Sequence, residues 1–183
     1  DNLRKFIKFS IGGNIGKIIV MLVGVLIGMT APLLPLQLLW LNLLTDGFLG
    51  VGLGVEPAER NVMKRKPFSP QASIFSGGVG GQIIRFGLLI GVISLGMGAW
   101  HFFTGHDDWQ TMMFTTLAFA QIWQALGIRS GNDSLFKVGL FSNKPLFGLV
   151  LVVALGQLAA IYRPALNAFL RTSPLASTDF MLC

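Results

Sequence analysis

The chain has 183 residues, of which 52% are hydrophobic and only 12% are charged, against roughly 25% charged residues in ordinary soluble domains. A mean hydropathy of +0.67, with apolar runs of roughly eighteen residues or more, excludes a water-soluble globule and a disordered chain. The glycines have no fixed period and the chain has a single cysteine, which excludes collagen and a disulfide scaffold. The net charge of +6 comes without a nucleic-acid recognition motif. We therefore expect its basic residues to contact anionic lipid headgroups and no nucleic acid.

Five apolar segments are long enough to cross a bilayer, which takes about 20 helical residues. We expect membrane helices at Ile11 to Met29, Leu33 to Val55, Val79 to Phe103, Thr111 to Ile128 and Leu146 to Tyr162. The sequence thus predicts an all-α membrane protein with a single membrane domain over residues 1–183 and a basic, proline-containing loop at about 56–78. An odd number of spans followed by an apolar end suggests that the chain belongs to a longer protein.

The distribution of basic residues predicts the orientation, because Lys and Arg in short loops stay on the cytoplasmic side. They gather before the first helix, around the loop after the second, and after the fourth: Arg4, Lys5, Lys8, Arg60, Lys64, Arg65, Lys66, Arg85, Arg129, Lys137 and Lys144. The opposite connections contain none, although one holds His101, His106, Asp107 and Asp108, which we expect to be solvated or to bind a metal weakly. We predict a multi-pass protein of the plasma (inner) membrane with a cytoplasmic N-terminus.

Glycine pairs spaced four apart recur in the predicted helices. They are Gly12 and Gly16, Gly24 and Gly28, Gly50 and Gly54, and Gly87 and Gly91. Small residues at this spacing let helix backbones approach closely in lipid, although the high glycine content of membrane helices would also produce such pairs. Both interpretations predict a packed bundle.

Two charged side chains, Lys17 and Asp46, fall inside the predicted helices. Each costs roughly 2.5 to 3.5 kcal/mol at the centre of a membrane helix unless it is paired or hydrated. Counted from the turn between the first two helices, Lys17 lies about 20 Å deep and Asp46 about 16 Å. On the fourth helix, Gln121 lies about 15 Å from the same surface. Three helices therefore place polar groups near one plane in the middle of the membrane.

Helical spacing predicts that the oxygens of this plane converge. Asn42, Thr45 and Asp46 share one helix face, and so do Asn14 and Lys17. Gly47 should let the second helix unwind and expose carbonyl groups, as in transporter helices that bind cations. Carboxylate, amide and hydroxyl oxygens suit calcium, magnesium, manganese, sodium or protons. Alternatively, Asn14 and Gln121 are interhelical hydrogen-bonding residues and Lys17 extends to the membrane surface.

The stretch Leu38 to Gly47, reading Leu-Leu-Trp-Leu-Asn-Leu-Leu-Thr-Asp-Gly, resembles the sixth transmembrane helix of P-type cation-transporting ATPases, especially the calcium-pump branch. Asn2 to Lys17 resembles the start of the fifth helix, and Leu53 to Pro57 with Met63 to Pro70 resembles the loop after the sixth. The resemblance covers the whole chain, most strongly residues 1 to 70, and implies helices five to nine of the C-terminal transmembrane region.

The resemblance also implies roles for residues. The family's cation ligands fall on Asn14, Asn42, Thr45 and Asp46, and the helix-eight ligand, a glutamate in calcium pumps, falls on Gln121. The helix-five glutamate of pumps with two calcium sites falls on Lys17, which we interpret as a built-in counter-ion to Asp46 that leaves one site. The transported cation would be calcium-like, with a proton, sodium or manganese possible.

The chemistry that drives such a pump is absent from this sequence. The family's phosphorylation motif, Asp-Lys-Thr-Gly, does not occur, nor does a phosphate-binding loop, and no residues form a catalytic constellation. ATP and Mg²⁺ would bind only in cytoplasmic domains outside this chain. The implied partners are the lipid bilayer and the remaining helices and cytoplasmic domains of the parent pump. Two alternatives are an independent small channel or carrier not driven by ATP, and a structural scaffold.

Overall fold

The computed structural model describes residues 2–57, 75, 77–130, 139 and 142–183, and all regular elements within these ranges are helices. In chain order they are α1 (Asn2–Leu26), α2 (Pro35–Trp40), the π-helix η1 (Leu41–Gly47), α3 (Phe48–Gly54), α4 (Val79–Phe103), α5 (Trp109–Ser130), α7 (Lys144–Tyr162), α8 (Pro164–Leu170) and α9 (Ser177–Leu182). Most of the predicted loop at 56–78 lies outside the described residues, as do Arg60, Lys64, Arg65, Lys66 and Lys137. The predicted all-α membrane bundle is confirmed.

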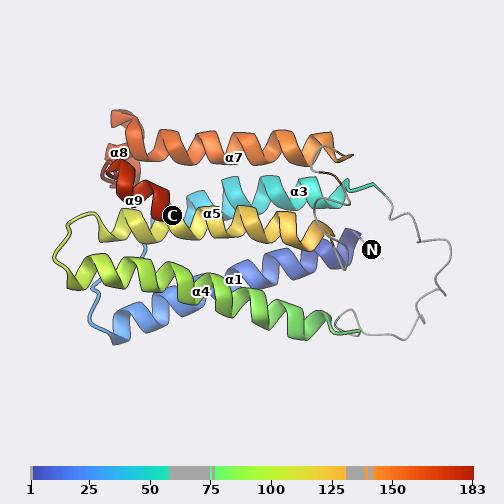
Figure 1. Ribbon diagram of the computed structural model, residues 1–183, viewed down its shortest axis with the longest axis horizontal. Helices are drawn as coiled ribbons and strands as arrows, with labels where there is room; N and C mark the ends of the chain where they lie inside the picture. The colour runs from blue at the N-terminus through green and yellow to red at the C-terminus, as the bar shows by residue number, and fades with distance from the viewer. Residues whose placement is uncertain (1, 58–74, 76, 131–138, 140–141) are drawn as a thin grey trace.

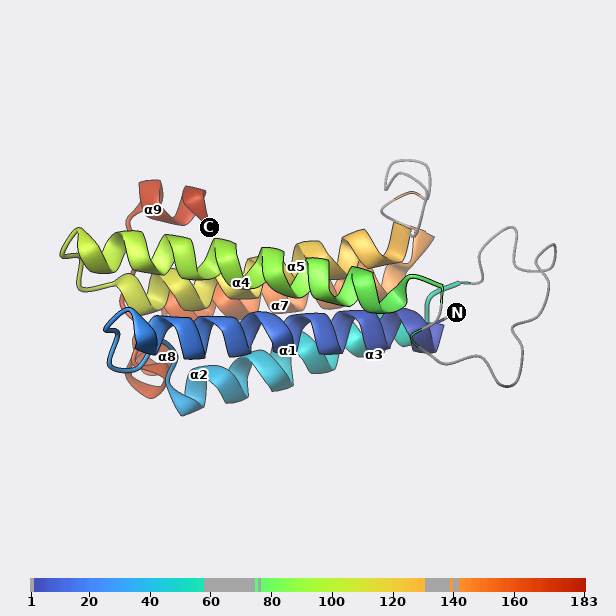
Figure 2. The same cartoon turned by 90° about the horizontal axis from the view of Figure 1, so that it is seen from below.

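The long helices run side by side along the longest axis of the molecule (Figure 1). Asn2, the end of α3 and the start of α4 lie at one end of the bundle, which we call the Asn2 end, and α8 and α9 lie at the opposite end (Figures 1 and 2). α5 contacts α1, α3, α4, α7 and η1. Because of this central position, side chains of α5 contact several neighbouring helices.

The observed helices differ from the predicted spans mainly at their ends. α1 begins at Asn2 and not at Ile11, because its first turns contain Arg4, Lys5 and Lys8, which continue the helix but not the apolar run. α7 begins at Lys144, after the side chain of Asn143 caps it by accepting a hydrogen bond from the Leu146 amide at 2.9 Å. Hydropathy identifies the apolar part of a helix, whereas capping residues set where the helix begins.

Among the described residues, four helical segments are long and apolar enough to cross a membrane: Asn2–Leu26, Pro35–Gly54, Val79–Phe103 and Lys144–Tyr162. α5 has 22 residues but is not among them. Its sequence includes Thr111, Thr115, Thr116, Gln121 and Gln124, and all five side chains are buried. The fourth predicted span, Thr111 to Ile128, is therefore a helix whose polar residues are buried against the neighbouring helices.

Glycines let α1 and α4 pack closely, as the four-residue spacing predicted. A methyl group added to Gly16 would lie 2.8 Å from Ile90, and one added to Gly91 would lie 2.8 Å from Ile19. Gly28 and Gly54 behave differently, because a methyl group at either position would meet nothing within 4 Å. The close-packing interpretation is confirmed for the contact of α1 with α4 and is wrong for those two glycines.

This contact predicts the effect of a small substitution. In Gly87→Ala the new methyl group would lie 2.5 Å from Ile15 and 3.1 Å from the Gly12 carbonyl oxygen, so we expect a loss of about 1–3 kcal/mol of stability. In the control Gly96→Ala the methyl group meets nothing within 4 Å. Thermal unfolding of the purified protein in detergent measures both, and equal midpoints for the two variants would contradict the packing.

Candidate ion-binding site

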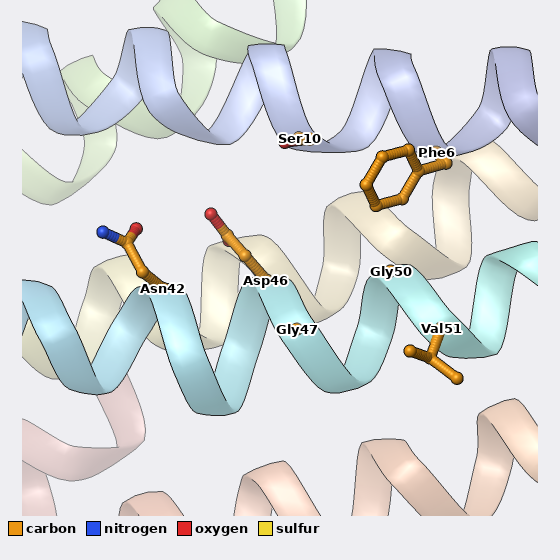
Figure 3. Close-up of a pocket in the computed structure, with 7 residues that line it drawn as sticks. All are labelled: Phe6, Ser10, Asn42, Asp46, Gly47, Gly50 and Val51. Atoms are coloured by element: carbon orange, nitrogen blue, oxygen red, sulfur yellow. The ribbon is translucent and has the colours of Figure 1, made fainter.

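The helix that carries Asp46 changes its hydrogen-bonding pattern where the polar residues lie. Leu41–Gly47 form a π-helix between α2 and α3, and such turns within α-helices occur frequently at functional sites. The predicted unwinding at Gly47 is wrong, because Gly47 keeps right-handed helical angles, with φ −63° and ψ −57°. The helix widens by a π-turn and its backbone stays helical, and Asn42 and Asp46 of η1 line the site with their side chains (Figure 3).

Lys17 and Asp46 form an ion pair between α1 and η1. The Lys17 Nζ donates to Asp46 Oδ2 at 2.5 Å, to Asn42 Oδ1 at 2.6 Å and, more weakly, to Asn14 Oδ1 at 3.4 Å. The side chains of Lys17 and Asp46 are 7% and 13% exposed. An ammonium group has three protons to donate, and here three oxygens accept them. Lys17 therefore points at Asp46 and does not extend to the membrane surface.

Gln121 brings α5 to the same carboxylate. Its Nε2 donates to Asp46 Oδ1 at 2.7 Å. Gln121 Oε1 and Thr45 Oγ1 are both buried and have no hydrogen-bond partner among the described residues. Buried polar atoms are normally paired, so these two oxygens are the atoms next to Asp46 that still lack a donor or a cation.

The structure brings most, but not all, of the predicted site residues into contact. It joins Asn14, Lys17, Asn42, Asp46 and Gln121 in one hydrogen-bonded group. Thr45 is fully buried next to Asp46 in sequence, and its hydroxyl group is not hydrogen-bonded to this group. Gln124, which shares a helix face with Gln121, instead donates to the backbone carbonyls of Lys8 and Phe9 at 3.4 and 3.3 Å.

The π-helix η1 and α3 together form one segment, residues 41–54, which we call the Asp46 helix. An open cleft of about 430 Å³ between α1 and the Asp46 helix gives access to Asp46. Its lining residues are Phe6, Ser10, Asn42, Asp46, Gly47, Gly50 and Val51. In Figure 3, Asn42 and Asp46 point from the Asp46 helix toward α1, and Phe6 lies above Gly50. Sequence reasoning missed Phe6 and Ser10, although Ser10 lies four residues before Asn14 and therefore on the same helix face.

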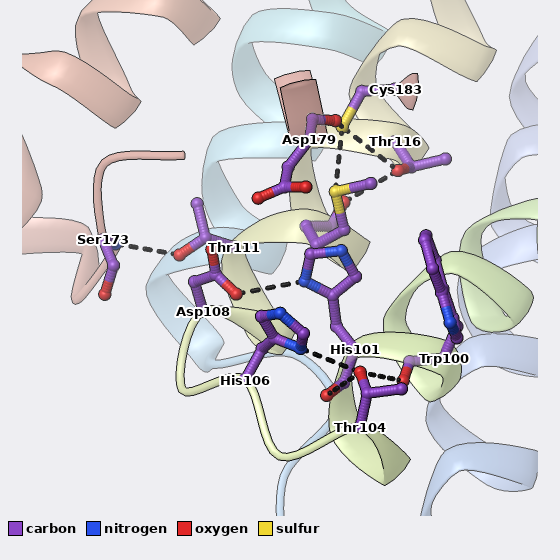
Figure 4. Close-up of polar contacts among 11 residues, drawn as sticks. Trp100, His101, Thr104, His106, Asp108, Thr111, Thr116, Ser173, Asp179 and Cys183 are labelled. Atoms are coloured by element: carbon purple, nitrogen blue, oxygen red, sulfur yellow. Dashed lines mark hydrogen bonds and ion pairs between the residues drawn. The ribbon is translucent and has the colours of Figure 1, made fainter. Parts of the chain in front are cut away.

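The histidines at the opposite end of the bundle do not form a metal site. His101 is 2% exposed, its Nδ1 lies 3.1 Å from Asp108 Oδ1, and its ring centroid lies 4.8 Å from that of His106 (Figure 4). The prediction that both histidines are solvated is wrong for His101, because α4 extends to Phe103 and packs this side chain inside the bundle. Within the described ranges, no three His, Cys, Asp or Glu residues are grouped to hold a metal ion.

Comparisons with known proteins identify the family of the chain. Residues 30–183 match the family described as Cation transporting ATPase, C-terminus. The chain belongs to this family of P-type cation ATPases. It is 36% identical over 185 residues to a calcium-transporting ATPase of Bacillus subtilis, covering 100% of this chain and 21% of that protein.

Two further relatives extend the comparison. Identity is 34% over 183 residues to calcium-transporting ATPase 1 of Bacillus cereus, covering 90% of this chain and 20% of that protein. It is 30% over 188 residues to calcium-transporting ATPase type 2C member 2 of Rattus norvegicus, covering 99% of this chain and 20% of that protein. The chain spans about a fifth of the length of these relatives. It is the C-terminal membrane region of a P-type cation ATPase.

The ion pair of this ATPase region predicts strong energetic coupling between Lys17 and Asp46. Removing either charge leaves the other buried and unpaired, so Lys17→Met and Asp46→Asn should each cost about 3–5 kcal/mol. The double variant should cost clearly less than the sum, because neither charge then remains. Thermal unfolding of the complete purified protein measures this, with Lys144→Met at an exposed lysine as the control. Strict additivity of the two losses would show that the charges do not interact.

Proposed function

We propose that this chain is the membrane part of an ATP-driven pump for a hard cation, with calcium as the first choice, and that Asp46 is the centre of one cation site. The single observation that carries the proposal is the carboxylate of Asp46, only 13% exposed, which α1 and α5 hold through Lys17 and Gln121, while Asn42 accepts from the same ammonium group. The names of the relatives from Bacillus subtilis and Rattus norvegicus support calcium as the cargo.

The proposed ligands are all oxygen atoms. Asp46 supplies the negative charge, and Asn14, Asn42, Thr45 and Gln121 supply neutral oxygens. Thr45 Oγ1 and Gln121 Oε1 support the proposal most directly, because each is buried without a hydrogen-bond partner among the described residues. Calcium takes six to eight oxygen ligands at about 2.3–2.6 Å and tolerates irregular geometry, which suits a mixed set of this kind.

Lys17 is the proposed built-in counter-ion. Its ammonium group occupies the oxygens of Asn14, Asn42 and Asp46, which are also proposed ligands. A cation that binds there must displace the ammonium group from Asp46, and when the cation leaves, the ammonium group neutralises the carboxylate again. A second cation beside Lys17 would be repelled by a like charge in a medium of low dielectric constant. We therefore propose one site.

The parent pump would supply the parts that this chain lacks. ATP and Mg²⁺ would act in its cytoplasmic domains, and phosphorylation there would alternate access to Asp46, with a different cation affinity in each state. Asn14 and Asn42 are exposed, Asn42 lines the cleft, and exposed amides are costly in lipid. This supports a further helix of the parent pump over the cleft. The apolar side chains on the outer surface, such as Leu22, Leu43 and Leu155, suit contact with the bilayer.

The proposed orientation has the Asn2 end of the bundle in the cytoplasm, and the proposed location is the plasma (inner) membrane. Of the described basic residues, Arg4, Lys5 and Lys8 belong to the first turns of α1, and Arg129 and Lys144 flank the 131–143 connection. Arg163 and Arg171 follow α7 at the opposite end. The excess of positive charge at the Asn2 end supports this orientation.

The number of cations bound by the complete pump tests the role of Lys17. We expect wild type to bind one calcium ion per molecule and Lys17→Glu to bind about two, because a second carboxylate replaces the ammonium group. Binding of radioactive calcium to the purified complete protein measures this. Lys144→Glu makes the same change of charge at an exposed residue outside the site and should still bind one.

Two outcomes would contradict the proposal. One ion bound by both wild type and Lys17→Glu would mean that Lys17 does not limit the number of sites. Unchanged binding in Asp46→Asn would remove Asp46 from the site and favour a structural role for the carboxylate. Binding of manganese or sodium in place of calcium, measured in the same way, would change the cargo and leave the site intact.

A further inference from the structure

A second buried ion pair joins the helices of Asp46 and Gln121 at the Asn2 end. The Arg129 Nε donates to Glu56 Oε1 at 2.7 Å, and these side chains are only 1% and 4% exposed. Glu56 follows the end of α3, and Arg129 lies in the last turn of α5. Nothing in the cation site requires this pair, since neither residue contacts Asp46 or lines the cleft.

Residues from two other helices complete the cluster. The Asn143 Nδ2 donates to Glu56 Oε2 at 2.5 Å and to the Gly52 carbonyl at 3.1 Å, while Asn143 Oδ1 caps α7. The Asn2 Nδ2 donates to the Glu56 carbonyl at 2.7 Å. Both carboxylate oxygens of Glu56 therefore have donors. We call Glu56, Arg129 and Asn143 the Glu56 clamp.

We propose that the Glu56 clamp is a positioning device for the cation site, which sets the axial register of the Asp46 helix against the Gln121 helix. This inference rests on the proposed function of Asp46. Glu56 lies ten residues after Asp46, and Arg129 lies eight residues after Gln121, or about 15 and 12 Å along the helices. A charged pair with directional hydrogen bonds fixes one register, whereas apolar side chains allow small sliding. The hydrogen bond from Gln121 to Asp46 depends on that register.

If the Glu56 clamp only stabilised the fold, removing its charges would leave cation affinity unchanged. A buried ion pair can often be replaced by apolar residues of similar size without loss of stability, so this can be tested in a folded variant. The Arg129 Nη2 also donates to Ser142 Oγ. In the double variant Glu56→Met with Arg129→Met, Asn143 keeps the Gly52 carbonyl as an acceptor, and Ser142 still donates to the Gly139 carbonyl. No buried charge remains among these partners, and one N–H of Asn143 Nδ2 loses Glu56 Oε2 as its acceptor. Stability and cation affinity can therefore be separated in this variant.

The experiment measures binding of radioactive calcium and thermal unfolding on the complete purified pump. We expect the double variant to unfold near the wild-type midpoint and to bind calcium roughly two- to thirty-fold more weakly, with the number of ions per molecule unchanged. Arg129→Lys keeps the charge but cannot reach Glu56 and Ser142 together, and should weaken binding in the same direction. The control Tyr162→Phe removes a hydrogen bond to the Leu175 carbonyl at the opposite end of α7 and should bind as wild type does.

The outcomes distinguish this inference from the proposed function. Wild-type affinity in both the double variant and Arg129→Lys, with binding still abolished by Asp46→Asn, would overturn the positioning role alone. Binding that does not depend on Asp46 would overturn the proposed function itself. If the double variant does not fold, the affinity of Arg129→Lys decides, and an affinity equal to wild type overturns the positioning role.

Discussion

The central physical constraint in this protein is the cost of holding one carboxylate inside a membrane bundle. Asp46 is tolerated because Lys17 neutralises it at 2.5 Å and Gln121 donates to its other oxygen at 2.7 Å. These contacts come from α1 and α5, so the carboxylate requires both helices to pack against η1. The glycines that bring α1 close to α4 and the central position of α5 serve this requirement.

Under the proposed function, the ammonium group of Lys17 would give the site two balanced states. With Lys17 on the carboxylate, the buried charges cancel and the site is stable without a bound ion. With a cation on the carboxylate, the ammonium group would lose Asp46 and would compete with the cation for the oxygens of Asn14 and Asn42. A transport cycle would have to change the difference in free energy between these two states. During that change, the Glu56 clamp would hold the Asp46 helix and α5 in register.

The sequence predicted that these polar side chains converge, because helical spacing and depth along a helix depend only on positions in the chain. Helical spacing and depth placed Asn14, Lys17, Asp46 and Gln121 near one plane before any contact was known, and the structure brings these four together. Other features depend on tertiary packing. The π-helix at Leu41–Gly47 leaves no mark on residue spacing, and Glu56 and Arg129, at helix ends next to loops, looked like ordinary surface charges. His101 was assigned to solvent because its helix was not expected to pack it inside the bundle.

The most direct test of the account is an experimental structure of the complete pump in saturating calcium. The account predicts one cation at about 2.3–2.6 Å from an Asp46 carboxylate oxygen, with Thr45 Oγ1 or Gln121 Oε1 among its ligands and the Lys17 ammonium group moved off the carboxylate. A calcium-loaded structure in which Lys17 still lies against Asp46 and the cation is bound elsewhere would contradict it.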